Sequence, residues 1–143
     1  VNQCGYSMVN RAEEENMKWA MENGIGIETH SSLANGILTG AIREVPTYPE
    51  DDIRNLYPYP HLKEPMFSKC MKLLETLDKL SAERGVPIAQ IALNWSTQKD
   101  YVTSALCGVR NVKEATENCK CTEWELTKEE MNMLDKAIED NLG

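Results

Sequence analysis

Apolar residues recur at every third or fourth position in three stretches of the chain, and this period is typical of an amphipathic helix. The clearest stretch is 66–84. Its apolar positions at this spacing are Met71, Leu74, Leu77 and Leu80. Gly85 comes directly after the stretch and is of the residue type that most often ends a helix. The same pattern predicts helices over 11–23, ended by Gly24, and over 88–98.

Two further helices are indicated by residues that cap helix N-termini. Asn111 can accept a hydrogen bond from the first turn of a helix over 112–120. Thr127 opens the sequence TKEE, which has the pattern of a capping box. Apolar residues at helical spacing follow it at Met131, Leu134 and Ile138. A helix is therefore predicted to close the chain.

Three short runs are typical of strands: VNQCGYS at 1–7, GIGIETHSS at 24–32, and the segment 102–106. Helix-length segments separate these runs, so the predicted order is strand, helix, strand, helices, strand, helices. Repeated strand-helix units imply a parallel sheet flanked by helices, in either a doubly wound sheet or part of a barrel. In both architectures ligands bind at the carboxyl ends of the strands.

One long segment, 33–65, shows no sustained period. It contains five prolines and three tyrosines. Segments of this length in compact domains are usually covers of a functional site or disordered regions. The segment is therefore a candidate for either.

Length and charge narrow the class of protein. A chain of 143 residues with 41% hydrophobic and 27% charged residues is typical of one soluble domain. The net charge of −8 argues against nucleic acid or an anionic membrane as a partner, because neither attracts an acidic protein. No apolar run reaches the roughly 18 residues of a membrane span, and no signal peptide opens the sequence. We expect a cytoplasmic protein.

The five cysteines are odd in number and unevenly spread, which is typical of reduced thiols rather than of a disulfide framework. Cys119 and Cys121 form half of a possible metal site. No second pair of ligands completes it, so we predict no metal.

Polar residues gather after the three predicted strands and would share one rim of the sheet. They are Gln3, Tyr6 and Ser7 after the first, His30, Ser31 and Ser32 after the second, and the turn 108–111 after the third. In that turn Gly108 permits close approach of a ligand, and Arg110 precedes a helix N-terminus that favours negative charge. The turn alone indicates either an anion site or an ordinary structural turn.

Several motifs, in the right order, give the chain a resemblance to the C-terminal portion of the aldo-keto reductases. NQCGYSMVNRAEEE resembles the sixth strand and helix of that family, and GIETHSSLANGILTG resembles its seventh strand with the cofactor-covering SPLxxGxLTGK loop. AERGVPIAQIALNWSTQ resembles the AQxALxW helix of the family. GVRNVKEATEN resembles its G(x)8EN element, and LTKEEMNMLDKAI resembles its LTxEExxxLD tail. The resemblance implies that residues 1–143 are the C-terminal part of a single (β/α)8 TIM barrel: its last three βα units and a C-terminal helix.

The resemblance also implies a cofactor site for NADP(H), with NAD(H) as an alternative. Gln3 would bind the nicotinamide carboxamide, and His30 would stack on the nicotinamide ring. Ser31, Leu33 and Ala34 would line the pyrophosphate, with Gly36 permitting close approach. The implied adenosine end consists of Gly108 and Arg110 at the 2′-phosphate, Glu114 beside them, and Glu117 and Asn118 at the adenine. The last three residues follow helical spacing, so they can face one ligand.

Four residues depart from the family pattern. His30 replaces a larger aromatic ring, and it could equally be a rim histidine bonded to a neighbour. Ser32 replaces a proline, and Ala41 replaces a lysine, which removes one cation from the cofactor site. Glu114 stands where a neutral or basic side chain is common. A carboxylate there disfavours binding of a 2′-phosphate but can accept a hydrogen bond from a ribose hydroxyl.

The catalytic tyrosine, lysine, aspartate and histidine of the family lie in the first half of its barrel, and none of their motifs occurs in this sequence. We therefore predict no catalytic residue, and we expect this chain to be inactive without the N-terminal half of the barrel.

Three of eight strands would leave two unpaired edges, so oligomerisation or partial unfolding is expected of the chain alone. The predicted function is reduction of an aldehyde or ketone by the intact protein. The alternative is a non-catalytic, regulatory nicotinamide-nucleotide-binding module.

Overall fold

A computed structural model describes all residues 1–143 of the chain. Its strands are β1 (Asn2–Gly5), β2 (Ile27–His30) and β3 (Ser104–Ala105). Its α-helices are α1 (Glu14–Glu22), α2 (Ile53–Leu56), α3 (Met66–Arg84), α4 (Ile88–Thr97), α5 (Val112–Cys119) and α6 (Lys128–Leu142). Three short 3-10 helices complete the chain: η1 (Ala34–Thr39), η2 (Pro60–Leu62) and η3 (Lys120–Thr122). No helix combines the length and the apolar character that crossing a membrane requires.

The three strands form one parallel sheet in the order β1-β2-β3, which confirms the predicted strand-helix repeat. β3 is shorter than the predicted strand 102–106, but its ladder extends at both ends. Thr103 donates its backbone N–H to the Ile27 carbonyl at 2.9 Å, and Leu106 donates to the Thr29 carbonyl at 2.7 Å. All three strands therefore run toward the same edge of the sheet.

The two faces of β2 have different environments. Ile27 and Thr29 are buried under the helices, whereas Glu28 is half-buried and His30 is exposed. This alternation follows from the period of two along a strand. The face that carries Glu28 and His30 is therefore not covered by the helices of this chain.

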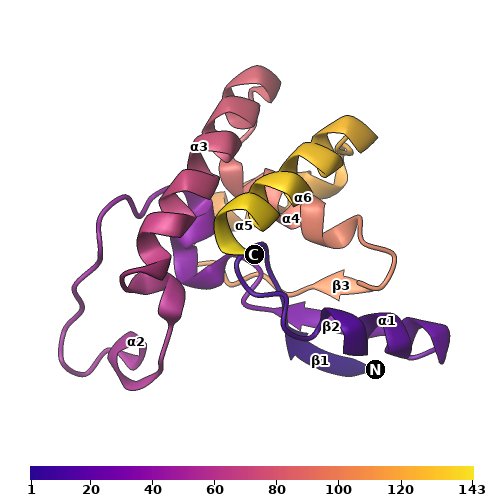
Figure 1. The fold of residues 1–143 in the computed structure, drawn as a ribbon, viewed down its shortest axis with the longest axis horizontal. Coiled ribbons are helices and arrows are strands. Elements are labelled where there is room, and N and C mark those ends of the chain that lie inside the picture. The colour runs from indigo at the N-terminus through magenta and orange to yellow at the C-terminus, as the bar shows by residue number, and fades with distance from the viewer.

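The helices gather on the other face and supply the core. Helix α3 lies side by side with α6 and also contacts α4, while the segment that contains α2 extends away from the sheet (Figure 1). The bounds of α3 agree with the predicted helix, and Gly85 ends it in the left-handed conformation with a φ of 67°. Nine of the ten residues of α4 are buried, because η1, η3, α3, α5 and β3 surround this helix.

Helix α1 begins at Glu14, three residues later than predicted. A tight turn precedes it, in which the backbones of Ser7 and Asn10 exchange two hydrogen bonds of 3.0 and 3.1 Å. The side chain of Asn10 then accepts from the Ala12 N–H at 3.3 Å. The Asn10 carbonyl, which would accept the first bond of a helix that starts at Arg11, is thus engaged in the turn.

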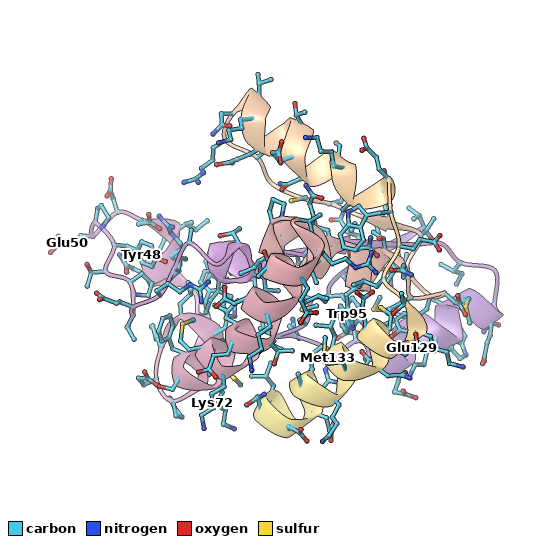
Figure 2. All side chains as sticks on the ribbon, turned by 90° about the horizontal axis from the view of Figure 1, so that it is seen from above. Tyr48, Glu50, Lys72, Trp95, Glu129 and Met133 are labelled. Atoms are coloured by element: carbon cyan, nitrogen blue, oxygen red, sulfur yellow. The ribbon has the colours of Figure 1, made fainter.

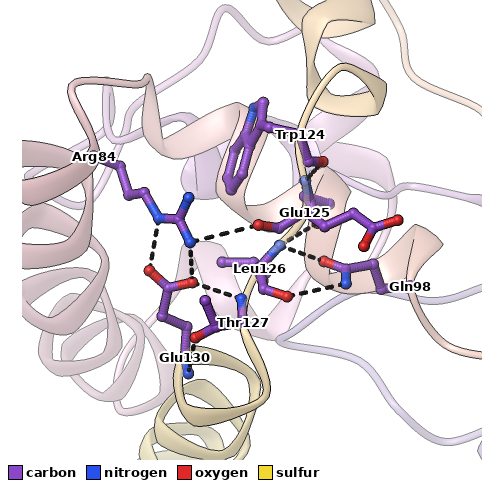
Figure 3. Close-up of polar contacts among 8 residues, drawn as sticks. Arg84, Gln98, Trp124, Glu125, Leu126, Thr127 and Glu130 are labelled. Carbon is purple, nitrogen blue, oxygen red and sulfur yellow. Dashed lines mark hydrogen bonds and ion pairs between the residues drawn. The ribbon is translucent and has the colours of Figure 1, made fainter.

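A polar cluster joins α3 to the N-terminus of α6 (Figure 3). Thr127 and Glu130 form the predicted capping box, with bonds of 3.2 Å from the Glu130 N–H and 2.7 Å from the Thr127 N–H. Arg84 donates from Nε and Nη2 to the same Glu130 carboxylate, the Nε bond being 2.6 Å. One carboxylate therefore both caps α6 and fixes the end of α3.

Glu130 makes the stability of the fold dependent on pH. The Arg84 hydrogen bonds hold the pKa of the Glu130 carboxyl below its ordinary value. A carboxyl with a lowered folded pKa stabilises the fold above its unfolded pKa, and this contribution is lost as the pH falls through the folded pKa. We expect the free energy of unfolding to fall as the pH drops below the ordinary pKa of a glutamate, and to fall less steeply in Glu130→Gln. Urea titrations at several pH values measure both slopes. Glu129→Gln, on the exposed side of the same turn, is the control, and an unchanged slope in Glu130→Gln would contradict this role.

Candidate functional site

His30 lies at the carboxyl end of β2 and leans over the neighbouring strand. In the sheet register Gly5 pairs with His30, and Gln3 pairs with Glu28. A Cβ atom on Gly5 would lie only 3.3 Å from Cε1 of His30, so glycine at this position gives the imidazole its room. The register and the alternation along each strand place Gln3 and His30 on the same, uncovered face of the sheet.

The loop after β2 has an unusual backbone. Ser31, Ala34 and Asn35 have φ values of 58°, 47° and 55°, a region that costs a residue with a Cβ roughly 1–2 kcal/mol. Gly36 follows with a φ of 98°. Left-handed residues of this kind cluster at ligand-binding sites, where the surrounding structure holds them in place.

Ser32 fixes this loop to β3. Its hydroxyl is buried and donates to the Leu106 carbonyl at 3.1 Å, and it also lies 3.4 Å from the hydroxyl of Thr29. The residue that departs from the family proline therefore joins the ends of two neighbouring strands. The loop that follows β2 is held beside the turn that follows β3.

Arg110 lies in that turn, and a single carboxylate holds it. Glu114 accepts from Arg110 Nη2 at 2.8 Å, from Nε at 3.2 and 3.4 Å, and from the Arg110 backbone N–H at 2.9 Å. These contacts raise the pKa of Arg110 and lower the pKa of Glu114. Asn111 caps the helix as predicted, accepting from the Glu114 N–H at 2.9 Å. The Arg110 side chain is nevertheless 88% exposed, so it remains accessible to a ligand.

A groove of about 900 Å³ connects the loop after β2 with the turn after β3. This volume is within the range of small-molecule and cofactor sites. Eight of the residues predicted for the cofactor line it: Ser31, Leu33, Gly36, Gly108, Arg110, Glu114, Glu117 and Asn118. Gly108 has open space where a Cβ would lie, so no protein atom would obstruct a ligand there. The structure thus brings together residues from two strand ends that are more than 70 positions apart.

Two polar contacts lie at the α5 end of the groove. Asn118 donates from Nδ2 to the Cys107 sulfur at 3.3 Å. Glu117 accepts from Lys120 Nζ at 2.8 Å, and this contact lowers the pKa of Glu117. All five cysteines of the chain are free thiols.

The opposite wall of the groove comes from the long segment 33–65, in which the predicted site residues were Leu33, Ala34 and Gly36 only. Tyr48 and Arg54 line the groove from this wall, with Ile42 and Pro46 beside them. The length of the segment was the only signal in the sequence that pointed to such a role. The segment therefore forms a wall of the groove and contains the short helices η1, α2 and η2.

A second cavity, of about 390 Å³, adjoins the groove and shares Ser31 and Asn35 with it. His30 and Ala34, two more of the predicted residues, line this cavity together with Tyr59 and His61. His61 Nε2 forms a hydrogen bond of 2.9 Å with the side-chain oxygen of Asn35, and burial lowers the pKa of His61. Gln3 lines neither cavity.

The arrangement provides what a nucleotide phosphate requires: guanidinium groups, a helix N-terminus and a glycine-containing loop around one groove. It also supplies the neighbouring carboxylates of Glu114 and Glu117, which can accept hydrogen bonds from hydroxyl groups.

Comparisons with known proteins bear on the family and the fold of the chain. The sequence model described as "Aldo/keto reductase family" matches residues 1–139. Aldo-keto reductase YhdN of Bacillus subtilis is 28% identical over 140 residues, which are 96% of this chain and 42% of that protein. A probable voltage-gated potassium channel subunit beta of Arabidopsis thaliana is 29% identical over 126 residues, 86% of this chain and 38% of that protein.

A solved structure, the glycerol dehydrogenase AKR11B4 from Gluconobacter oxydans, superposes with a TM-score of 0.85 at 25% identity. The match covers 98% of this chain and 42% of the dehydrogenase. The chain thus spans about two fifths of the length of these relatives, and its fold is that of the last βα units of their (β/α)8 barrel. The chain belongs to the aldo/keto reductase family.

Proposed function

We propose that this chain supplies the cofactor-binding part of an NADP(H)-dependent carbonyl reductase. The observation that carries the proposal is the groove. Residues that follow β2 and β3, and that the family resemblance assigns to the cofactor, line it. In this assignment the adenosine end lies at Arg110 and α5, and the pyrophosphate lies along the loop after β2. The nicotinamide then lies at His30, beside the second cavity.

The residues present suit such a dinucleotide. The loop after β2, with its left-handed residues, lies beside the groove, and the guanidinium of Arg110 matches a phosphate group. Gln3 is exposed and lies on the sheet face of His30, within the part of the site assigned to the nicotinamide. When bound, such a cofactor would supply a hydride for the carbonyl carbon of an aldehyde or ketone. The role of this chain is to bind and orient it, whereas the groups that transfer the proton belong to the N-terminal half of the barrel.

Glu114 affects which nucleotide this site prefers. Its carboxylate neutralises part of the Arg110 charge, which weakens attraction of a 2′-phosphate. It is also an acceptor for a ribose hydroxyl, as in NAD(H). We propose a preference for NADP(H), because Arg110 is almost fully exposed and keeps donors that Glu114 does not use.

The Arg110→Ala substitution in the full-length protein tests the proposal. We expect NADPH affinity to fall by at least about tenfold and NADH affinity by less than about twofold, because only NADPH carries the phosphate that the guanidinium would bind. Nucleotide fluorescence titrations measure both affinities, and reduction of a panel of aldehydes and ketones measures activity.

Lys136→Ala is the matched control, because Lys136 forms a comparable ion pair of 2.7 Å with Asp140 on α6, outside the groove. Equal losses for NADPH and NADH would remove the 2′-phosphate role of Arg110. Absence of binding of either nucleotide to the unaltered protein would overturn the proposed function as a whole.

A regulatory module is the second candidate, and the similarity to a probable potassium channel subunit beta favours it. In that case the groove binds the nucleotide as a regulatory signal rather than for turnover. Tight NADPH binding without reduction of any carbonyl compound in the panel would support the regulatory function. Turnover of even one aldehyde or ketone at a rate far above background would support the reductase.

A further inference from the structure

A hydrogen bond between His61 and Asn35 lies where the groove meets the second cavity. His61 Nε2 lies 2.9 Å from the side-chain oxygen of Asn35. Asn35 lines both the groove and the cavity, whereas His61 lines the cavity alone. The two residues are 26 positions apart in the sequence, so their bond closes the stretch 36–60 into a loop. That loop carries Tyr48 and Arg54, the polar residues of the opposite wall of the groove.

The part of this loop that forms the wall has no hydrogen bond to the helices or the sheet. Figure 2 labels Tyr48 and Glu50 on it, apart from Trp95 among the helices. Every hydrogen bond of residues 44–60 joins two residues of this stretch or reaches the turn directly after it. The position of the wall therefore depends on what holds the two ends of the stretch.

One side-chain contact lies at each end. At the start, Arg43 donates to both oxygens of Asp78 on α3, at 2.9 and 2.7 Å. At the end, His61 binds Asn35 among the left-handed residues 34–36. Arg43 and Asp78 are exposed, whereas the bond of His61 is partly buried. Because a hydrogen bond is stronger where water is excluded, the contact of His61 is the stronger of the two.

Asn35 also belongs to the turn that borders the groove. Its φ of 55° is left-handed, which asparagine adopts more readily than most residues with a Cβ but which still needs support from its surroundings. The other hydrogen bonds of residues 33–39 all lie within residues 31–41. The bond to His61 is thus the one hydrogen bond that connects this turn to a distant part of the chain.

We propose that His61 is a positioning residue of the groove, because its bond to Asn35 holds two sides of the groove at once. These sides are the turn at 34–36 and the wall at 44–60. His61 does not line the groove, so it acts through Asn35 rather than by contact with the phosphates of a nucleotide. The inference rests on the proposed function, because it assumes that the groove binds a nicotinamide dinucleotide.

Limited proteolysis of the full-length protein without nucleotide tests whether His61 holds the wall. Arg54 is the one trypsin site between Arg43 and Lys63. We expect cleavage after Arg54 to be at least about threefold faster in His61→Ala, because the released wall opens more often. His61→Gln is expected to restore most of the protection, because its amide can donate or accept a hydrogen bond. Unchanged cleavage in His61→Ala would overturn the proposal whether or not a nucleotide binds.

Nucleotide affinities of the full-length protein, from fluorescence titrations, test the effect on the groove. We expect His61→Ala to weaken NADPH and NADH equally, by about fivefold, because the bond supports parts of the groove that both nucleotides share. Asn35→Gly removes the partner amide and leaves a residue that adopts a positive φ freely. The double variant is expected to lose no more than either single variant, because each removes the same bond. Unchanged affinities, a loss for NADPH alone, or additive losses would each contradict the proposal.

The surroundings of His61 favour its neutral form. Burial lowers the pKa of His61, and no charged group contributes to this shift. The helix η1 has no ionisable side chain. The ionisable residues around His61 are those that line the cavity and those at the start of α3: Tyr6, His30, Tyr59, Lys63, Glu64 and Lys69. The last three are exposed. A ring with a lowered pKa is protonated more readily once it is released into water, so acid weakens the bond to Asn35.

We therefore expect NADH affinity to fall as the pH drops below about 6.5, the ordinary pKa of a histidine, and to fall less steeply in His61→Gln. NADH is the probe because a phosphate monoester, as in NADPH, itself titrates near pH 6. His30 is present in both proteins, so the difference between the two slopes belongs to His61. Equal slopes would show that the buried ring does not control the groove.

Ser68→Ala is the matched control. It removes a side-chain bond of 2.8 Å to Glu64, and Ser68 lines neither the groove nor the second cavity. We expect unchanged cleavage after Arg54 and unchanged affinities. Thermal melts by circular dichroism establish that each variant retains the fold. An unaltered protein that binds neither nucleotide would overturn the proposed function, and the cleavage rates would then still decide whether His61 holds the wall.

Discussion

Replacing Trp95 by alanine is expected to reduce the free energy of unfolding by about 3–5 kcal/mol, the range measured for removal of large buried aromatic side chains. Trp95 is 1% exposed and stacks on Tyr6 with ring centroids 5.5 Å apart. Its Nε1 donates to Asp135 at 2.7 Å, and Lys99 Nζ lies 4.7 Å from the ring centroid. The substitution would leave a cavity between α4, α6 and the end of β1. Urea unfolding followed by circular dichroism measures the loss without depending on tryptophan fluorescence.

Trp19→Ala is the matched control for this prediction. Trp19 lies on α1 and is 59% exposed, so its removal is expected to change stability by less than about 1 kcal/mol. Trp95→Phe separates the two contributions, because phenylalanine fills most of the volume and removes only the bond to Asp135. Similar losses in Trp95→Ala and Trp19→Ala would show that the Trp95 contacts do not stabilise the core.

Asn94→Leu is expected to cost about 2–4 kcal/mol, although leucine has nearly the same size and is more hydrophobic. Asn94 is 1% exposed and donates from Nδ2 to the carbonyls of Cys121 and Trp124, at 2.9 and 2.7 Å. Its Oδ1 accepts from the Leu126 N–H at 3.3 Å. Leucine would leave two buried carbonyl groups without donors, and this penalty exceeds the gain from a more apolar side chain.

Asn132→Leu, on the exposed side of α6, makes the same chemical change without removing a buried bond. We expect it to alter stability by less than about 0.5 kcal/mol. Urea unfolding compares the two variants under identical conditions. If Asn94→Leu is as stable as the unaltered protein, the segment 121–126 does not depend on this side chain for its position.

The helices were predictable because each carries its own local signals. The bounds of α3 follow from the spacing of its leucines and from Gly85, and the N-terminus of α6 follows from the TKEE capping box. The parallel sheet followed from the order of strands and helices, which requires crossover connections. By contrast, α1 starts late because a turn at 7–10 takes up the backbone groups that precede it. No local pattern in the sequence distinguishes that turn from a helical first turn.

The candidate site was predictable on one wall and not on the other. Arg110 and Glu114 belong to a motif with a fixed spacing, and the structure places them in one groove with the loop after β2. Tyr48 and Arg54 belong to a proline-containing segment without a period, so their position depends on the path of the whole segment. Gln3 shares a sheet face with His30 but lines no cavity, and its role in binding nicotinamide stays a prediction.

The two ion pairs of the groove are local in sequence, two positions apart at Asp52 and Arg54 and four apart at Arg110 and Glu114. Neither pair joins distant elements, in contrast to the contact of Arg84 with Glu130, which fixes two helices. The charge of the groove can therefore be altered during evolution without altering the architecture. Replacement of Glu114 by a neutral residue would free Arg110 entirely, and replacement of Arg110 would leave the carboxylate alone. A substitution at either position thus changes the charge of the groove and leaves the contact between α3 and α6 in place.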